Sequence, residues 1–261
     1  MSLLPPLNPP LPAWPDARVW VIGASTGIGA ATARRLLAAG ARVALSARSA
    51  DKLREVAAGR EHALVLPLDF TNVDAVGTAL ARVNEAWGGV DLVLVVAGTH
   101  HEMRAWELTD RDARALFEIN VHAVIGAVAT ALPTLLAQGR GAIGIVASVA
   151  GYSGLPKALI YGASKAAMIN FTETLYLDLH PKNIGVYLIN PGFVATPLTA
   201  QNDFRMPHLI SADEAAASLI AGLEAGAFEI HFPHAFTRQL KLLRLLPYRL
   251  YFSLVRRATG L

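Results

Sequence analysis

The sequence RVWVIGASTGIG occupies residues 18–29, near the start of the 261-residue chain. Its first five residues are largely apolar and predict a short strand, and the residues that follow have the spacing of a helix. Gly23, Gly27 and Gly29 lie in the turn between the two. Glycine permits a tight turn and a close approach of the backbone to a ligand, and a helix N-terminus attracts negative charge. The stretch therefore predicts a strand–turn–helix unit suited to a pyrophosphate, although packing alone can also require glycine at such a turn.

Strands and helices alternate along the rest of the chain. Strands are predicted at 18–22, 42–46, 63–68, 91–96, 142–147, 184–189 and 228–232, and helices at 28–39, 49–58, 73–87, 109–138, 161–179 and 211–223. Regular alternation with right-handed crossovers predicts a parallel sheet with helices on both faces. We therefore expect an α/β fold with a single doubly wound, Rossmann-type domain at residues 17–235. Its ligand crevice should lie at the carboxyl ends of the strands.

Composition and charge exclude several classes of protein. The chain has no cysteine, which excludes disulfides and cysteine metal sites and fits a reducing compartment. Six basic residues and no acidic residue follow Glu229, so the net charge of +3 leaves 3 − 6 = −3 for the remainder. That remainder has no basic footprint for nucleic acid. We expect no metal site. We also expect a cytoplasmic protein, because the N-terminus does not resemble a signal peptide and no apolar run is long and uncharged enough to span a bilayer.

Two segments flank the predicted domain. Residues 1–16 are proline-rich and should form an extended tether or surface strap. Residues 236–261 form a basic, apolar tail, predicted to be helical and interrupted at Pro247. Three interpretations of the tail stay open: it covers the domain or a partner subunit, it makes a peripheral contact with an anionic membrane, or it binds a separate protein.

Tyr161 and Lys165 lie four residues apart in the helix predicted at 161–179, so they share one face. An ammonium near a phenol favours the phenolate, which should lower the tyrosine pKa from about 10. Ser148 ends the preceding strand and adds a second hydroxyl. A bound carbonyl oxygen could accept hydrogen bonds from both Ser148 and Tyr161, so the pattern predicts a site that transfers a proton to or from an oxygen.

The end of the second predicted strand bears on cofactor choice. An acidic residue at this position would bind the ribose 2′-hydroxyl of NAD(H), but the sequence there is Ser46-Ala47-Arg48. A guanidinium suits a 2′-phosphate, so we expect NADP(H) to be preferred, with NAD(H) as the alternative. Asp69, followed by Phe70, ends the third strand and could accept from the adenine amino group or cap the next helix.

Taken together, Gly23–Gly29, Asn120, Ser148, Tyr161 and Lys165 resemble the short-chain dehydrogenase/reductase family, over about residues 18–232. The resemblance implies an oxidoreductase in which the tyrosine is the acid/base and the serine orients a carbonyl. It implies further that the lysine binds the nicotinamide ribose and lowers the tyrosine pKa, and that the asparagine holds a water that relays protons. These four residues are the expected catalytic set.

The resemblance extends to the segment 190–197, which is similar to the family segment that binds the nicotinamide carboxamide, with Thr196 as the hydroxyl contact. One departure is Val95-Val96, which stands where the family usually has two asparagines before Ala-Gly. Cofactor contacts are expected altogether from Gly23, Ser25, Thr26, Gly27, Ile28, Gly29, Arg48, Asp69, Phe70, Ala97, Gly98, Asn120, Tyr161, Lys165, Pro191, Gly192, Val194 and Thr196.

Substrate contacts are expected from Ser148, Leu155, Tyr161 and Phe193, with walls from residues 99–106 and 198–209. Met103, Trp106, Leu155 and Phe193 give this site apolar side chains, which indicates a carbonyl reductase acting on a lipophilic ketone, aldehyde or alcohol. His100-His101-Glu102 is interpreted as a polar rim of the site. A fatty-acid-type β-ketoacyl thioester reductase is the alternative enzyme, and an NADPH-binding regulator or scaffold without turnover is the alternative of another class. The resemblance also implies a homodimer or homotetramer.

Overall fold

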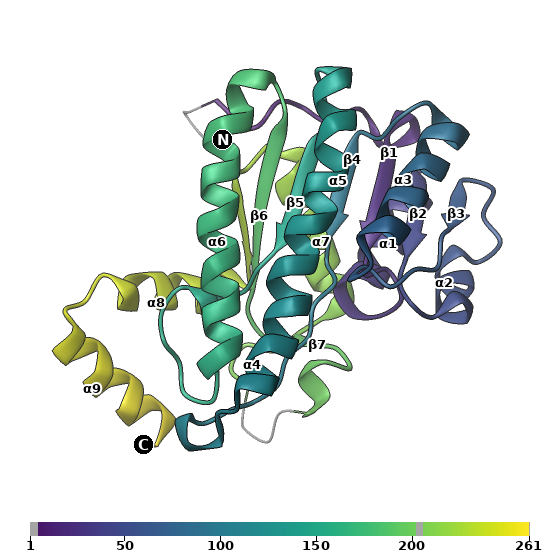
Figure 1. Cartoon of the computed structure of the whole chain (residues 1–261). Coiled ribbons are helices and arrows are strands. Elements are labelled where there is room, and N and C mark those ends of the chain that lie inside the picture. Colours follow the sequence, from purple (N-terminus) through teal and green to yellow (C-terminus); the bar gives the residue numbers. More distant parts are fainter. Residues whose placement is uncertain (1–4, 202–205, 261) are drawn as a thin grey trace.

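The computed structural model describes residues 5–201 and 206–260 and contains a seven-stranded parallel sheet (Figure 1). The strand order is β3-β2-β1-β4-β5-β6-β9. The strands are β1 (Arg18–Ile22), β2 (Arg42–Ser46), β3 (Ala63–Val65), β4 (Leu92–Val95), β5 (Ala142–Val146), β6 (Gly185–Pro191) and β9 (Glu229–Phe232). A separate two-stranded ribbon pairs β7 (Val194–Ala195) with β8 (Ile210–Ser211).

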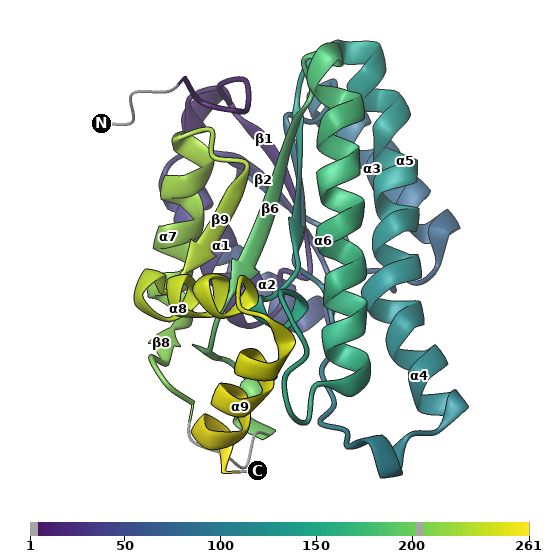
Figure 2. The ribbon, with the colours of Figure 1, turned by 90° about the vertical axis from the view of Figure 1, so that its left-hand side faces the viewer.

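Helices cover both faces of this sheet (Figure 2). One face carries α3 (Val73–Trp87), α4 (Asp110–Phe117), α5 (Ala123–Gln138) and α6 (Leu159–Leu179), and the other carries α1 (Gly27–Ala38), α2 (Ala50–Ala57) and α7 (Ala212–Glu224). Each face has its own apolar core. The strand β1 serves both, because Trp20 and Ile22 point to one core and Val19 and Val21 to the other.

The order of the strands reverses at β1, which lies between β2 and β4. The next connection along the chain passes from β3 across to β4 on the other side of β1. In open α/β sheets this switch point leaves a crevice at the carboxyl ends of the two strands. The sheet and its helical layers confirm the predicted Rossmann-type α/β fold.

One helical stretch runs from Asp110 to Gln138 through α4, a π-helical turn at Glu118–His122 and α5. By length and composition it is apolar enough to cross a membrane, so the expectation that no run reaches that threshold was wrong. Its apolarity has a role in the fold, because Val124, Val128 and Leu135 are buried against the sheet and α3.

The N-terminal extension is a strap held at the side of the sheet. Asn8 is buried, and its amide accepts from Val186 N (2.8 Å) and donates to Val186 O (2.9 Å). Its backbone N–H donates to Gly226 O (3.0 Å). Further along, Trp14 Nε1 donates to Glu224 (2.6 Å). The extended segment is thereby joined to β6 and to the end of α7; residues 1–4 of the predicted extension lie outside the described residues.

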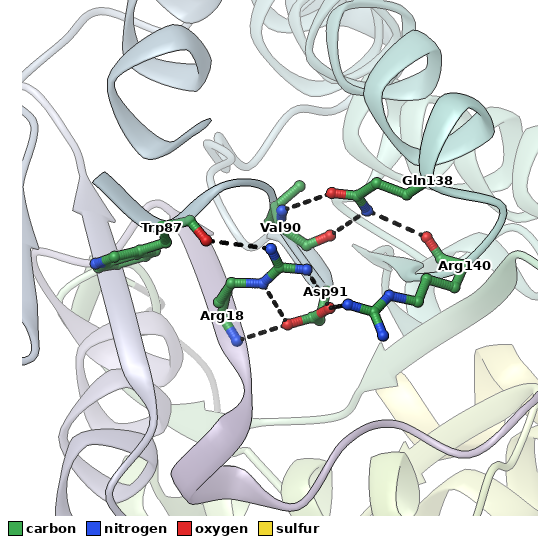
Figure 3. A network of polar contacts seen from close by, with 6 residues as sticks. All are labelled: Arg18, Trp87, Val90, Asp91, Gln138 and Arg140. Atoms are coloured by element: carbon green, nitrogen blue, oxygen red, sulfur yellow. Dashed lines mark hydrogen bonds and ion pairs between the residues drawn. The ribbon is translucent and has the colours of Figure 1, made fainter. Parts of the chain in front are cut away.

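At the amino ends of β1 and β4, Arg18 and Asp91 form a buried ion pair (Figure 3). Arg18 donates through Nη2 to Oδ1 (2.7 Å) and through Nε to Oδ2 (2.8 Å) of Asp91. Burial alone would raise the pKa of Asp91, but the hydrogen bonds and charge of Arg18 outweigh it and hold that pKa below its usual value. Gln138 bonds to both backbone groups of Val90, so the end of α5 joins the same network. The network fixes where the two central strands start.

The C-terminal segment forms two helices, α8 (His234–Arg244) and α9 (Tyr248–Thr259), with Pro247 as the N-cap of the second. The first helix starts two residues before the predicted tail, and its Thr237 is fully buried. The second extends away from the sheet (Figures 1 and 2).

Candidate active site

A cavity of about 730 Å³ lies at the carboxyl ends of the central strands. Of the residues expected to bind cofactor or substrate, the following line it: Gly23, Ser25, Thr26, Gly27, Ile28, Gly29, Arg48, Asp69, Phe70, Ala97, Gly98, Ser148, Tyr161, Lys165, Pro191, Gly192, Val194 and Thr196. Asn120, Leu155 and Phe193 do not line it. The topology therefore brings together nearly all of the predicted positions from separate βα loops.

The glycine turn after β1 is packed too closely for side chains. A Cβ added at Gly23 would lie 2.5 Å from the backbone nitrogen of Ala97, and one at Gly29 would lie 2.1 Å from Gly23 O. Gly23 also has a φ of 98°, which favours glycine. Thr26, the N-cap of α1, makes no side-chain capping bond, and the first turn of the helix lines the cavity. This geometry fits a pyrophosphate.

At the end of β2, Arg48 is exposed and lines the cavity together with Lys52 of α2. Lys52 was not predicted from the sequence, because a lysine in the first turn of a surface helix gives no signal by itself. Asp69 accepts from the backbone N–H (3.1 Å) and the hydroxyl (2.8 Å) of Thr71. These bonds, with a smaller effect of the Arg48 charge, lower the pKa of Asp69. The N-cap of α3 is Asn72, so Asp69 does not cap that helix.

Lys165 is buried on α6 and reaches the carboxyl end of β5, where its Nζ donates to Val146 O (3.0 Å). Burial lowers the pKa of this amine to about 8. Gly98 lies directly beside it, since a Cβ at Gly98 would be 3.4 Å from Nζ. The buried amine is therefore held by one carbonyl and kept close to the range in which it could exchange a proton at neutral pH.

Tyr161 lies in the first turn of α6, and Ser148 lies two residues after the end of β5. Their side chains are joined by a hydrogen bond. Burial raises the pKa of the Tyr161 phenol, and its bond with Ser148 opposes this without cancelling it. The expected lowering of this pKa by Lys165 is therefore wrong for this structure. The physical reason is that desolvation of the phenol dominates, with the lysine Nζ 5.8 Å from the centre of the tyrosine ring.

Asn120 lies fully buried in the π-helical turn between α4 and α5. Its amide accepts from Thr99 N (2.8 Å) and donates to Thr99 O (2.9 Å) and to Ser164 Oγ (3.2 Å). Ser164 in turn donates to the backbone carbonyl of Tyr161 (2.7 Å). Asn120 thus joins the loop after β4 to the second turn of α6. Sequence analysis missed Ser164, although its position beside Lys165 placed it in the same helix.

His100 packs edge to face against Tyr161, with the ring centres 4.5 Å apart. The sequence placed His100 only in the wall after the fourth strand, because its contact with the tyrosine depends on the path of that loop. Within residues 5–201 and 206–260, no group of histidine and carboxylate side chains is arranged to hold a metal ion.

The other side of the site comes from residues after β6. Thr199 accepts from Thr196 N (3.1 Å) and donates to Val194 O (2.5 Å), which fixes the turn that carries Thr196. Phe193 stacks on Phe236 of α8, with ring centres 5.4 Å apart, and so faces the C-terminal segment. Of the segment 198–209 expected to close the site, residues 202–205 lie outside the described residues.

The loop after β4 keeps its position without the asparagines that its sequence lacks. Val96 N and Ala97 N both donate to Ile22 O, at 2.8 and 3.0 Å. Val95, the last residue of β4, is buried and pairs with Ile22 of β1, and Val96 lines the cavity. Main-chain bonds to β1 thus hold the chain where the side-chain amides are missing.

Residues 17–205 match the family model described as short chain dehydrogenase. The chain belongs to this family. It is 32% identical, over 241 residues, to an uncharacterised oxidoreductase of Myxococcus xanthus, an alignment that covers 91% of this chain and 95% of the relative. An uncharacterised oxidoreductase of Staphylococcus aureus strain N315 is 34% identical over 185 residues, which cover 69% of this chain and 79% of the relative. This protein is therefore a short-chain dehydrogenase/reductase, an enzyme of a family that uses NAD(P) and a small-molecule substrate.

The depressed pKa of Lys165 predicts how stability depends on pH. The folded pKa of about 8 lies below the ordinary 10.5, so the unfolded chain binds the proton more strongly and stability rises with pH between the two values. Relative to Lys165→Met, the wild-type free energy of unfolding should gain about 3 kcal/mol over this range. Urea unfolding at a series of pH values measures the difference. The exposed Lys182, substituted as Lys182→Met, serves as control. If the difference in unfolding free energy from the wild type is independent of pH for both variants, the prediction is contradicted.

Proposed function

We propose that this enzyme is an NADP(H)-dependent oxidoreductase that interconverts a carbonyl and an alcohol on a lipophilic small molecule, with Tyr161 as the acid/base. The observation that supports it most is the hydrogen-bonded pair of Tyr161 and Ser148, which lines the cavity beside the buried amine of Lys165. Two hydroxyl donors directed at one space can both bond to one carbonyl oxygen.

The bound cofactor would supply or accept the hydride at the substrate carbon. During reduction Tyr161 donates its proton to the substrate oxygen, and its raised pKa keeps the phenol protonated and able to do so. Ser148 donates a second hydrogen bond to the same oxygen. Lys165 exchanges the replacement proton, since its pKa of about 8 is close to neutral pH. Asn120 completes this tetrad by holding the adjoining loop and α6, beside the route by which a water could return the proton.

The cavity residues divide into three parts for the cofactor. The glycine turn and the N-terminus of α1 would take the pyrophosphate. Arg48 and Lys52 would bind the 2′-phosphate, with Asp69 near the adenine. The turn at 191–196 would take the nicotinamide carboxamide, with Thr196 as its hydroxyl contact.

The substrate would occupy the space between His100, Ser148 and Tyr161, with Leu155 and Phe193 farther out. Beyond the polar groups that would bind the substrate oxygen, Leu155 and Phe193 offer apolar side chains, which supports a lipophilic ketone, aldehyde or alcohol. A β-ketoacyl thioester reductase stays the second candidate, because α9 carries three arginines and is hydrogen-bonded to the loop that precedes α6, so an acidic carrier protein could bind there. Ser148, Tyr161 and Lys165 all line one cavity, which argues against a regulator without turnover.

The proposed setting of the enzyme is cytoplasmic, with a peripheral membrane contact through residues 236–261 and a homodimer or homotetramer as the assembly. The long helices support the assembly, because Ile125 and Leu136 of α5 and Leu159 and Leu177 of α6 are exposed.

Tyr161→Phe removes the proposed acid without changing the shape of the ring. The turnover number with a panel of lipophilic ketones and aldehydes should fall by roughly a hundredfold or more, because general acid catalysis is lost. The dissociation constant for NADPH, followed by its fluorescence, should stay unchanged. Tyr176→Phe on the same helix is the matched control and should keep wild-type turnover. A Tyr161→Phe enzyme with the wild-type rate would refute the assignment.

Arg48→Ala removes the proposed 2′-phosphate ligand. The KM for NADPH should rise roughly tenfold or more, whereas the KM for NADH should change little, since a charge-assisted bond is lost only with the phosphorylated cofactor. Arg54→Ala, an exposed arginine on α2 that does not line the cavity, is the control. Wild-type activity confined to NADH would contradict the proposed cofactor preference.

A further inference from the structure

Helix α9 leaves an unusual set of apolar side chains in solvent. Leu245, just before the helix, is 80% exposed, and Tyr248, its first residue, is 77% exposed. Further along the helix, Leu250 is 55% and Phe252 53% exposed. The rings of Tyr248 and Phe252 stack in parallel, 5.5 Å apart, on the outside of the helix. Single exposed apolar residues are ordinary, but a group of large ones on one element indicates a contact surface.

The same helix is strongly basic. Arg249, Arg256 and Arg257, with Phe252 and Ser253, line an open hollow of about 430 Å³. No acidic residue follows Glu229 in the sequence, so no carboxylate of α9 itself can neutralise these arginines. Guanidinium groups bind phosphate oxygens through charge-assisted pairs. The surface therefore combines anion binding with apolar contact.

Helix α9 is fixed to the loop that leads into the active site. Tyr251 Oη donates to the carbonyl of Gly154 (2.6 Å), in the loop between β5 and α6. The preceding helix α8 is held to the same region, since Lys241 donates to Glu229 (2.5 Å) and Glu229 also accepts from the Tyr152 hydroxyl (2.5 Å). Only Lys241, among the basic residues of the described C-terminal segment, enters a salt bridge in this way.

A third segment adjoins this loop. The chain between β4 and α4 is hydrogen-bonded to it, since Met103 N donates to Lys157 O (2.9 Å). That segment carries Trp106, which is 81% exposed, and Leu108, which is 49% exposed. In both Figure 1 and Figure 2 this segment and α9 lie at the same end of the molecule, the end to which the carboxyl ends of the strands point. Exposed aromatic side chains at one end are typical of proteins that contact a membrane interface.

We propose that α9 and the segment 99–109 form a docking surface for an anionic lipid bilayer, with lipid phosphates at Arg249, Arg256 and Arg257. Because this surface adjoins the loop before Tyr161, the docked enzyme takes its lipophilic substrate from the bilayer; this last consequence rests on the proposed function, whereas the docking does not. An acidic carrier protein would match the arginines but leaves the exposed aromatic and leucine side chains unexplained. A bilayer matches both.

Vesicle flotation of the full chain tests the docking without reference to turnover. The wild type should float with vesicles of phosphatidylcholine containing roughly one-third phosphatidylserine and stay below with phosphatidylcholine alone. The triple substitution Arg249→Gln, Arg256→Gln and Arg257→Gln should weaken binding at least tenfold. Phe252→Ser should weaken it as well. The matched control removes three exposed arginines elsewhere, by Arg34→Gln, Arg54→Gln and Arg82→Gln, and should float as the wild type does.

Four outcomes would overturn the proposal. Wild-type protein that does not float refutes it, as does a triple variant that floats like the control. A wild type that stays unbound while the triple variant changes its sedimentation coefficient would assign the surface to a second copy of the chain. A wild type that binds an acyl carrier protein but no vesicle would assign it to the carrier. The Tyr161→Phe variant should still float. Membrane docking is therefore tested independently of the proposed catalytic role of Tyr161.

Discussion

The amine of Lys165 is buried, and the geometry around it follows from that constraint. A buried ammonium loses hydration and needs a polar partner, which Val146 O provides at the end of β5. To reach this carbonyl, α6 must begin beside the end of β5, and that position brings Tyr161 to Ser148. Gly98 lies directly against the amine, since a Cβ there would be 3.4 Å from Nζ. The geometry of the candidate active site thus depends on how one buried charge is accommodated.

The loop after β4 is held by several contacts, most of them hydrogen bonds to its backbone. Asn120 binds it from the π-helical turn, and two backbone N–H groups bind it to Ile22 O. The glycine turn after β1 packs against the same loop through the close approach of Gly23 to Ala97. Because these bonds are mainly to the backbone, the replacement of the usual asparagines by Val95-Val96 leaves the path of the chain intact.

The sequence was sufficient for the fold because its strands and helices alternate with clear periodicity, and the parallel sheet follows from that alternation. It was also sufficient to place Ser148, Tyr161 and Lys165, since their spacing and the ends of their elements determine where they meet. It was insufficient where the outcome depends on the path of a loop or on desolvation. The contact of His100 with Tyr161 and the raised pKa of that phenol are both of this kind. Likewise, the apolar stretch of α5 could be recognised as part of a core only once its packing was known.

The central claim is that this cavity carries hydride between NADPH and a carbonyl carbon. Deuterium transfer tests it most directly: the enzyme is given NADPH deuterated at both positions of nicotinamide C4, with a panel of lipophilic ketones and aldehydes, and the alcohols are examined by mass spectrometry. The account predicts one deuterium on the carbinol carbon of each alcohol formed and none on its oxygen. Alcohol formed without deuterium at that carbon, or no alcohol from any carbonyl while NADPH binds normally, would contradict it.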